Sequence, residues 1–314
     1  MKYLKTVFIV SLVTLAFFNW APGEEKPVQE VQVIGEFFGQ PVPAQNYFFV
    51  KSVLLAFANR LGLAPQSEEE LEGYAWDYLL LSYEAFRNNI AATPEEISAE
   101  IKNILKKDNV RFDWNKDKDA FARWVKEKTN QTLVVFENQV RFIVEINKLR
   151  QQIINSLVVV ASEEEAHRAF QDEHNSISVD VIGFLKQEDA QAFYDKAREN
   201  PTLWEEQKTK QPGSFKHYEF ATLTMLMAEL AIDRDTLYKM LQLTDGQIYQ
   251  ALPIVRGFAV SKILNKKLAE EVEYAKLKYS YVEQTKEKKK NQGFQEWFGM
   301  VKQKAKIKIY KRGG

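Results

Sequence analysis

Few residues of this chain carry side chains that could perform acid–base, nucleophilic or metal chemistry. Its 314 residues include three histidines and no cysteine, which excludes thiolate nucleophiles, disulfides and cysteine-bound zinc. His167 and His174 stand seven residues apart, whereas a metal-binding pair on a helix is usually four apart and needs a third ligand. We interpret both as helix-surface histidines, assign no catalytic residue and expect no metal site.

The other polar residues match no common catalytic motif. The sequence holds neither a glycine-rich phosphate-binding loop nor the turn that exposes a nucleophilic serine. The acidic pairs at 95–96 and 270–271 suit helix starts or solvated faces better than a placed acid–base pair. His217, with Glu219 two residues later, is interpreted as a surface histidine, with the remnant of a polar cluster as the alternative. We expect no cofactor.

Apolar side chains offer a different kind of chemistry, the binding of other apolar chains. For most of the aromatic residues, core packing is the ordinary interpretation. The alternative is an open apolar groove, in which flexible methionines suit varied partners. The candidates for such a groove are Phe37, Phe38, Trp76, Phe121, Trp124, Met225, Met227, Phe258, Trp297 and Phe298.

The net charge is zero, but charge is unevenly distributed along the chain. A zero net charge provides no field for nucleic acid or an anionic membrane, and we expect no nucleic-acid partner. Residues 63–101 hold nine acidic residues and one arginine, whereas residues 265–314 hold fourteen basic and six acidic residues. These opposite charges favour docking of helix 268–303 on segment 71–104, and the alternative is two separately solvated helix faces.

The N-terminal residues indicate export. Lys2 and Lys5 give the first residues a positive charge, and an apolar run of twelve residues follows at 7–18. A signal-peptide core needs about 7–15 apolar residues, and a membrane-spanning helix needs about 20. Residues 1–23 are therefore expected to be a cleaved signal of a periplasmic or extracytoplasmic protein. The alternative is an uncleaved inner-membrane anchor, with the protein facing the periplasm.

Helix signals dominate the first half of the chain. Ser67 and Thr93 are each followed three residues later by a glutamate, which is the pattern of a helix N-cap with a capping box. An apolar stripe at helical spacing runs through the last segment before residue 157. We expect helices at 44–62, from 67 onward, at 94–107, 116–129 and 132–156.

The sequence changes character at residue 158. Residues 176–185 have the composition of a strand, whereas Pro201, Pro212 and Gly213 predict a loop over most of 200–220. The expected helices are 162–173, 188–199, 222–230, 233–242 and the long basic 267–303, and the expected strands are 176–185, 248–255, 258–264 and 306–310.

Several of these segments resemble one family. The motif Gly-x-Pro-Val at 39–42, followed by Asn-Tyr-Phe, resembles the opening strand, turn and helix of the SurA/PpiD/PrsA class of exported chaperones. Residues 75–97 resemble the second helix of that class and its junction, and residues 136–151 resemble its connecting helix. Residues 294–309 are similar to its closing helix and strand.

The middle of the chain resembles, in its layout, the parvulin-type peptidyl-prolyl isomerase domain of that class. Residues 256–260 stand where active parvulins carry Phe-Gly-Tyr-His, and Ala259 replaces the histidine. Val181 stands near the place of the other histidine, on the first strand. The serine-containing segment and the glycine-rich loop of active parvulins are not recognisable in this sequence. Residues 213–218 occupy roughly their position. The resemblance therefore implies a degenerate domain.

The resemblance implies an α+β fold in three parts that follow the expected signal or anchor at 1–23. Residues 31–157 would be a helical chaperone part, 158–265 the inserted parvulin-like domain, and 266–314 the helix and strand that complete the chaperone module. The implied function is ATP-independent binding of unfolded or partly folded exported polypeptides. Two alternatives are an active isomerase around His217 and a structural module for one dedicated partner or for dimerisation.

Overall fold

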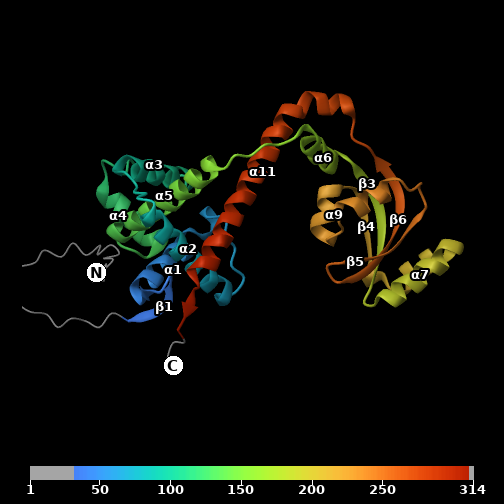
Figure 1. The fold of residues 1–314 in the computed structure, drawn as a ribbon, viewed down its shortest axis with the longest axis horizontal. Helices are drawn as coiled ribbons and strands as arrows, with labels where there is room; N and C mark the ends of the chain where they lie inside the picture. The colour runs from blue at the N-terminus through green and yellow to red at the C-terminus, as the bar shows by residue number, and fades with distance from the viewer. Residues whose placement is uncertain (1–31, 311–314) are drawn as a thin grey trace, which may run out of the picture. The chain divides into compact units, whose positions relative to one another are not determined.

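The computed structural model describes residues 32–310 (Figure 1). The predicted signal or anchor at 1–23, with its apolar run at 7–18, lies outside the described residues. Within them, no helix is both long and apolar enough to cross a membrane. The many helices and two small antiparallel sheets confirm the predicted α+β class.

The described helices and strands follow one another in this chain order. The helices are α1 (Ala44–Phe57), α2 (Glu68–Arg87), α3 (Pro94–Lys107), α4 (Lys118–Thr129), α5 (Leu133–Ser156), α6 (Glu163–His174), α7 (Gln187–Glu199), α8 (Thr202–Lys210), α9 (Leu223–Leu230), α10 (Arg234–Leu241) and α11 (Glu271–Ala305). The strands are β1 (Val33–Phe37), β2 (Gln40–Pro43), β3 (Ser176–Phe184), β4 (Phe215–Thr222), β5 (Ile248–Ile254), β6 (Gly257–Lys267) and β7 (Lys308–Ile309).

The chain divides into two compact units, one of residues up to 79 with those from 306 onward, and one of residues 80–305. The domain borders predicted at 157 and 265 both fall inside the second unit, and they stay a prediction. The first unit contains a three-stranded sheet of order β2-β1-β7. Its last strand comes from the end of the chain, because Glu36 of β1 pairs with Lys308 of β7 (Figure 1).

The turn and the packing of β1 depend on two glycines. Phe38 and Gly39 both have positive φ, at 52° and 69°, which fits a two-residue hairpin turn between β1 and β2. At Gly35, a Cβ atom would lie 2.4 Å from the carbonyl oxygen of Lys308 and 2.6 Å from the ring of Trp76. Only glycine therefore allows β7 and α2 to approach β1 so closely.

In the second unit, α11 packs on α6 and on α5. Phe170 of α6 forms a buried aromatic cluster with Tyr274 and Tyr281 of α11. Lys278 and Lys289 of α11 form ion pairs with glutamates in the first turn of α6. The predicted docking of this basic helix on 71–104 stays a prediction.

A four-stranded antiparallel sheet of order β4-β3-β6-β5 lies in the same unit. Side chains alternate between its two faces. One face, with Val179 and Ile263, packs under α9 and α10. The other, with Ile182 and Val260, packs against α7 and α8, and Figure 1 shows α7 and α9 on different sides of the strands.

The predicted loop at 200–220 is wrong, because α8 and β4 occupy most of it. Trp204 of α8 is fully buried against the sheet, and burial of so large an apolar side chain stabilises a short helix that propensity alone would not. Strand β4 pairs along β3. The prolines fit because Pro201 precedes α8 and Pro212 begins a short 3₁₀ turn.

Candidate functional site

The two positions where the resemblance places histidines lie on neighbouring strands of the four-stranded sheet. Val181 of β3 is 4% exposed and Ala259 of β6 is fully buried. Both belong to one apolar cluster, which also contains Met240 of α10. Neither side chain can donate or accept a hydrogen bond, so neither can take part in proton transfer or polarise a substrate.

The polar features of this face include the buried hydroxyls of Ser261 and Tyr218 and one ion pair. Ser261 pairs directly across from Val181, and its Oγ is buried without a hydrogen-bond partner. Lys216 Nζ lies 4.5 Å from the ring centroid of Tyr218 and 2.7 Å from Glu229 Oε2 on α9. The hydrogen bond to Glu229 raises the pKa of Lys216 above its usual range, so this ammonium remains charged and paired.

His217 lies on the opposite face of the sheet, and its partner is Asp180. The register of β3 and β4 sets these two residues side by side, with Nδ1 2.7 Å from Asp180 Oδ1. The carboxylate is buried, whereas the imidazole is 46% exposed. Glu219 was the neighbour of His217 expected from the sequence, whereas Asp180 was not expected there. A charged residue inside an otherwise apolar strand was the signal that could have found it.

His167 and His174 both face α11, so they are part of a helix contact. His167 Nε2 lies 2.9 Å from Glu271 Oε1, and His174 Nε2 lies 3.1 Å from the hydroxyl of Tyr281. Across residues 32–310, no group of three or more histidine, aspartate or glutamate side chains is arranged to hold a metal ion.

The ten candidate binding residues differ in exposure. Four of them are buried and fill apolar interiors: Phe37, Trp76, Phe121 and Phe298. Five are half-buried: Phe38, Trp124, Met227, Phe258 and Trp297. Met225 is 44% exposed. Phe258 packs with the α7 and α8 face, opposite Ala259, so it is not beside the two histidine positions.

The structure also exposes apolar residues that the sequence analysis did not select. Val158 and Val160, in the extended segment between α5 and α6, are 98% and 74% exposed. The segment is held along α11, because Leu157 packs against Gly293 and Lys289 Nζ donates to the carbonyl oxygen of Val160. Three consecutive valines at 158–160 were the available sequence signal.

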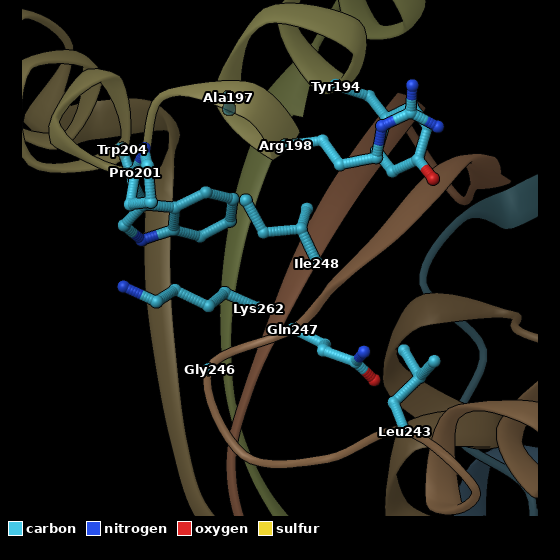
Figure 2. A pocket seen from close by; sticks show the side chains of 10 residues that line it. All are labelled: Tyr194, Ala197, Arg198, Pro201, Trp204, Leu243, Gly246, Gln247, Ile248 and Lys262. Atoms are coloured by element: carbon cyan, nitrogen blue, oxygen red, sulfur yellow. The ribbon is translucent and has the colours of Figure 1, made fainter.

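A cavity of about 370 Å³ opens between α7, α8 and the β5–β6 side of the sheet. Its apolar wall includes Leu243 and Ile248, and Trp204 lines one end. Figure 2 shows Trp204 and Lys262 at one end, and Arg198 with Tyr194 at the other. The cavity lies on the face opposite Val181 and Ala259.

No family model and no curated protein matches this sequence. Solved structures that match this chain include one of the two SurA-like chaperones PEB4 and Cj1289 of Campylobacter jejuni, with 14% sequence identity, a TM-score of 0.41 and coverage of 89% of this chain and 99% of that chain. The peptidyl-prolyl isomerase PrsA of Bacillus anthracis matches with 16% identity and a TM-score of 0.42, over 74% of this chain and 99% of that chain. PrsA of Bacillus cereus matches with 14% identity and a TM-score of 0.41, over 90% of this chain and 95% of that chain.

Proposed function

We propose that this protein is an extracytoplasmic chaperone that holds non-native exported polypeptides without ATP and does not catalyse prolyl isomerisation. In this proposal 31–157 and 266–314 form the chaperone module, and 158–265 is a degenerate parvulin-like domain. The observation that supports it most is the apolar face at Val181 and Ala259. Prolyl isomerisation has a barrier of about 18–20 kcal/mol, and lowering it requires polar groups at the peptide bond.

Two further observations support the holding role. Pairing of β1 with β7 joins the two ends of the chain in one sheet, and packing of α11 on α5 joins the closing helix to the early helices. This is the layout that the family resemblance predicts for a chaperone module. Val158 and Val160 add exposed apolar surface, the feature by which such proteins contact unfolded chains.

Light scattering of an unfolded exported protein during dilution from denaturant tests the holding role. We expect suppression of aggregation at equimolar chaperone, without ATP. Changing Val158 and Val160 together to serine should weaken suppression, while Val134→Ser, which alters an exposed valine on α5, should not. No suppression by the wild-type protein would refute the proposal.

A second candidate function is an active isomerase, and the Asp180–His217 pair favours it. When Nδ1 donates its proton to the carboxylate, Nε2 is available as a proton acceptor. Proline-limited refolding of a model protein separates the two candidates. We expect no acceleration at catalytic amounts, whereas acceleration that is lost in His217→Ala would establish the isomerase.

A further inference from the structure

The cavity between α7, α8 and the sheet is surrounded by hydrogen-bond donors. Lys262 and Arg198 contribute charged groups at its two ends (Figure 2). Gln247 accepts from the backbone N–H of Thr244 through its Oε1, at 2.8 Å. Figure 2 shows this amide on the Leu243 side of the cavity, and its nitrogen is a donor.

These donors have few acceptors of their own. The carboxylates paired with Lys262 and Arg198 are Glu205 and Glu199, each at 4.0 Å. Both glutamates are largely exposed to solvent, at 65% and 79%, so they compensate the cations weakly. A donor-rich cavity with distant carboxylates favours a ligand that brings acceptor oxygens and negative charge.

The buried indole of Trp204 is a second, independent sign of a ligand. Trp204 is fully buried, and its Nε1 has no hydrogen-bond partner. Buried N–H groups are nearly always paired in folded proteins, so an unpaired one needs an explanation, and a bound water, ion or ligand is one of them. Lys262 Nζ lies 5.8 Å from the centroid of this ring, so an acceptor bound beside the ammonium group would also lie near the indole.

The walls and the size limit the ligand further. Leu243, Ile248 and Pro201 form apolar walls, and a cavity of about 370 Å³ lies at the small end of the range for ligand sites. We infer that the cavity binds an apolar group that carries a carboxylate, with the carboxylate beside Lys262 and Trp204 and the apolar group against Ile248. A C-terminal residue of a polypeptide and a free acylated amino acid both have this chemistry.

Calorimetric titration of the full chain with four probes tests the inference. The probes are N-acetyl-leucine, its amide, a hexapeptide with a C-terminal leucine, and the same peptide amidated. We expect each free acid to bind at least tenfold more tightly than its amide, and the tighter of the two acids identifies the source. Equal binding of acids and amides, or no binding, would overturn the inference.

Variants locate the site. Lys262→Met keeps the aliphatic stem and should weaken acid binding about tenfold, which corresponds to about 1.4 kcal/mol. Lys210→Met removes an exposed lysine of α8 that lies outside the cavity and should change nothing. Gln247→Glu keeps the acceptor for Thr244 but adds a negative charge, so it should also weaken binding. Wild-type affinity in both cavity variants would contradict the assignment.

This site is separate from the proposed chaperone surface. Lys262→Met should therefore suppress aggregation as well as the wild-type protein does. Loss of acid binding with full suppression supports the cavity alone, and acid binding by a protein that fails to suppress aggregation removes the proposed function without affecting the cavity.

Discussion

Lys308 and Glu36 are 272 residues apart in the sequence, and their side chains form an ion pair with Nζ 2.5 Å from Oε1. Tyr310 donates its hydroxyl to the other carboxylate oxygen, at 3.0 Å. Its backbone N–H also donates to the carbonyl oxygen of Ile34, at 2.9 Å. The last strand is therefore held to the first by its backbone and by two side chains on one carboxylate.

Glu36→Gln should loosen this attachment. The hydrogen bond from Lys308, followed by that from Tyr310, lowers the pKa of Glu36 below 4.5. The stabilisation is therefore complete above pH 4.5 and is lost as the pH falls through the lowered pKa. Amides of residues 308–310 should exchange hydrogen faster in Glu36→Gln at pH 7, and the difference in melting temperature from wild type should shrink in acid.

Glu69→Gln is the matched control, because this exposed glutamate lies at the start of α2. It should leave exchange at 308–310 unchanged. Equal exchange rates in wild type and Glu36→Gln would show that backbone pairing alone holds β7.

Gly35→Ala should destabilise the first unit. The new methyl would overlap the carbonyl oxygen of Lys308 and the ring of Trp76, and overpacking of this kind costs about 1–3 kcal/mol. Gly73→Ala is the control, because nothing lies within 4 Å of its Cβ position inside α2. Alanine there should stabilise the helix by about 0.5–1 kcal/mol. Urea denaturation measures both, and a stable Gly35→Ala protein would contradict the close approach of β7.

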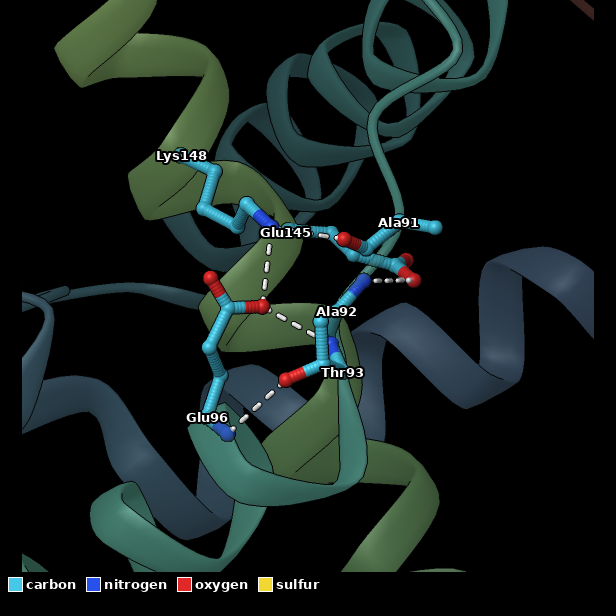
Figure 3. A network of polar contacts seen from close by, with 6 residues as sticks. All are labelled: Ala91, Ala92, Thr93, Glu96, Glu145 and Lys148. Carbon is cyan, nitrogen blue, oxygen red and sulfur yellow. Dashed lines mark hydrogen bonds and ion pairs between the residues drawn. The ribbon is translucent and has the colours of Figure 1, made fainter.

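A polar network connects the start of α3 to α5 (Figure 3). Thr93 Oγ1 accepts from the backbone N–H of Glu96, and the Glu96 carboxylate accepts from the Thr93 N–H and from Lys148 Nζ. The hydrogen bond from Lys148 lowers the pKa of Glu96. Burial raises the pKa of Glu145, although the backbone N–H of Ala92 donates to it.

Thr93→Ala removes the cap of α3 and should lower the free energy of unfolding by about 0.5–2 kcal/mol. Ser98→Ala, at an exposed position of the same helix, should change it by less than about 0.5 kcal/mol. Chemical denaturation compares the two variants. An equal effect of both would show that the capping box does not stabilise the helix.

Arg234→Met should destabilise the second unit more at pH 7 than at pH 4. Arg234 lies 2.6 Å from the buried carboxylate of Asp172. Burial raises the pKa of Asp172 despite this partner, and burial with the nearby carboxylate raises that of Tyr238 to about 12. Without the arginine the ionised carboxylate loses its counter-charge, at a cost of about 1–2 kcal/mol because solvent screens part of it.

The sign of the pH effect follows from the raised pKa. The folded state binds the proton of Asp172 more tightly than the unfolded state, so stability falls as the pH rises from 3.8 through the folded pKa. Removing Arg234 raises this pKa further and enlarges the loss at pH 7. Arg168→Met breaks an exposed pair with Glu164 and should cost about 0.5 kcal/mol or less at either pH. The midpoints of urea denaturation at pH 7 and pH 4, compared between each variant and the wild-type protein, measure this difference.

Local signals in the sequence predicted most of the elements, and contacts between distant residues explain the misses. Thr93 starts its helix with the expected capping box, and Ser67 accepts from the Glu70 N–H, although Glu70 accepts from Gln66 rather than from Ser67. Such caps depend on a few consecutive residues and can therefore be recognised in the sequence. The burial of Trp204 and the register that pairs Asp180 with His217 depend on strands that meet only in the folded chain. For this reason the prolines led to the prediction of a loop in the segment where α8 and β4 form.

For the candidate site, sequence reasoning located Val181 and Ala259, and the structure sets both in one apolar cluster. It did not find the cavity at Trp204 and Lys262, because these residues come from a helix and a strand with no common motif. It also selected Phe37 and Phe121 by type, although hydrophobicity alone cannot separate an interior aromatic from an open one.

The place of β7 has a consequence for biosynthesis. Strand β1 leaves the ribosome long before its partner exists, and until then its outer edge shows unpaired N–H and C=O groups. The β1–β2 hairpin alone is marginally stable, so this sheet reaches its final form only after Lys308 and Ile309 have been made. Nascent or shortened chains that end before β7 would carry a sticky edge of their own.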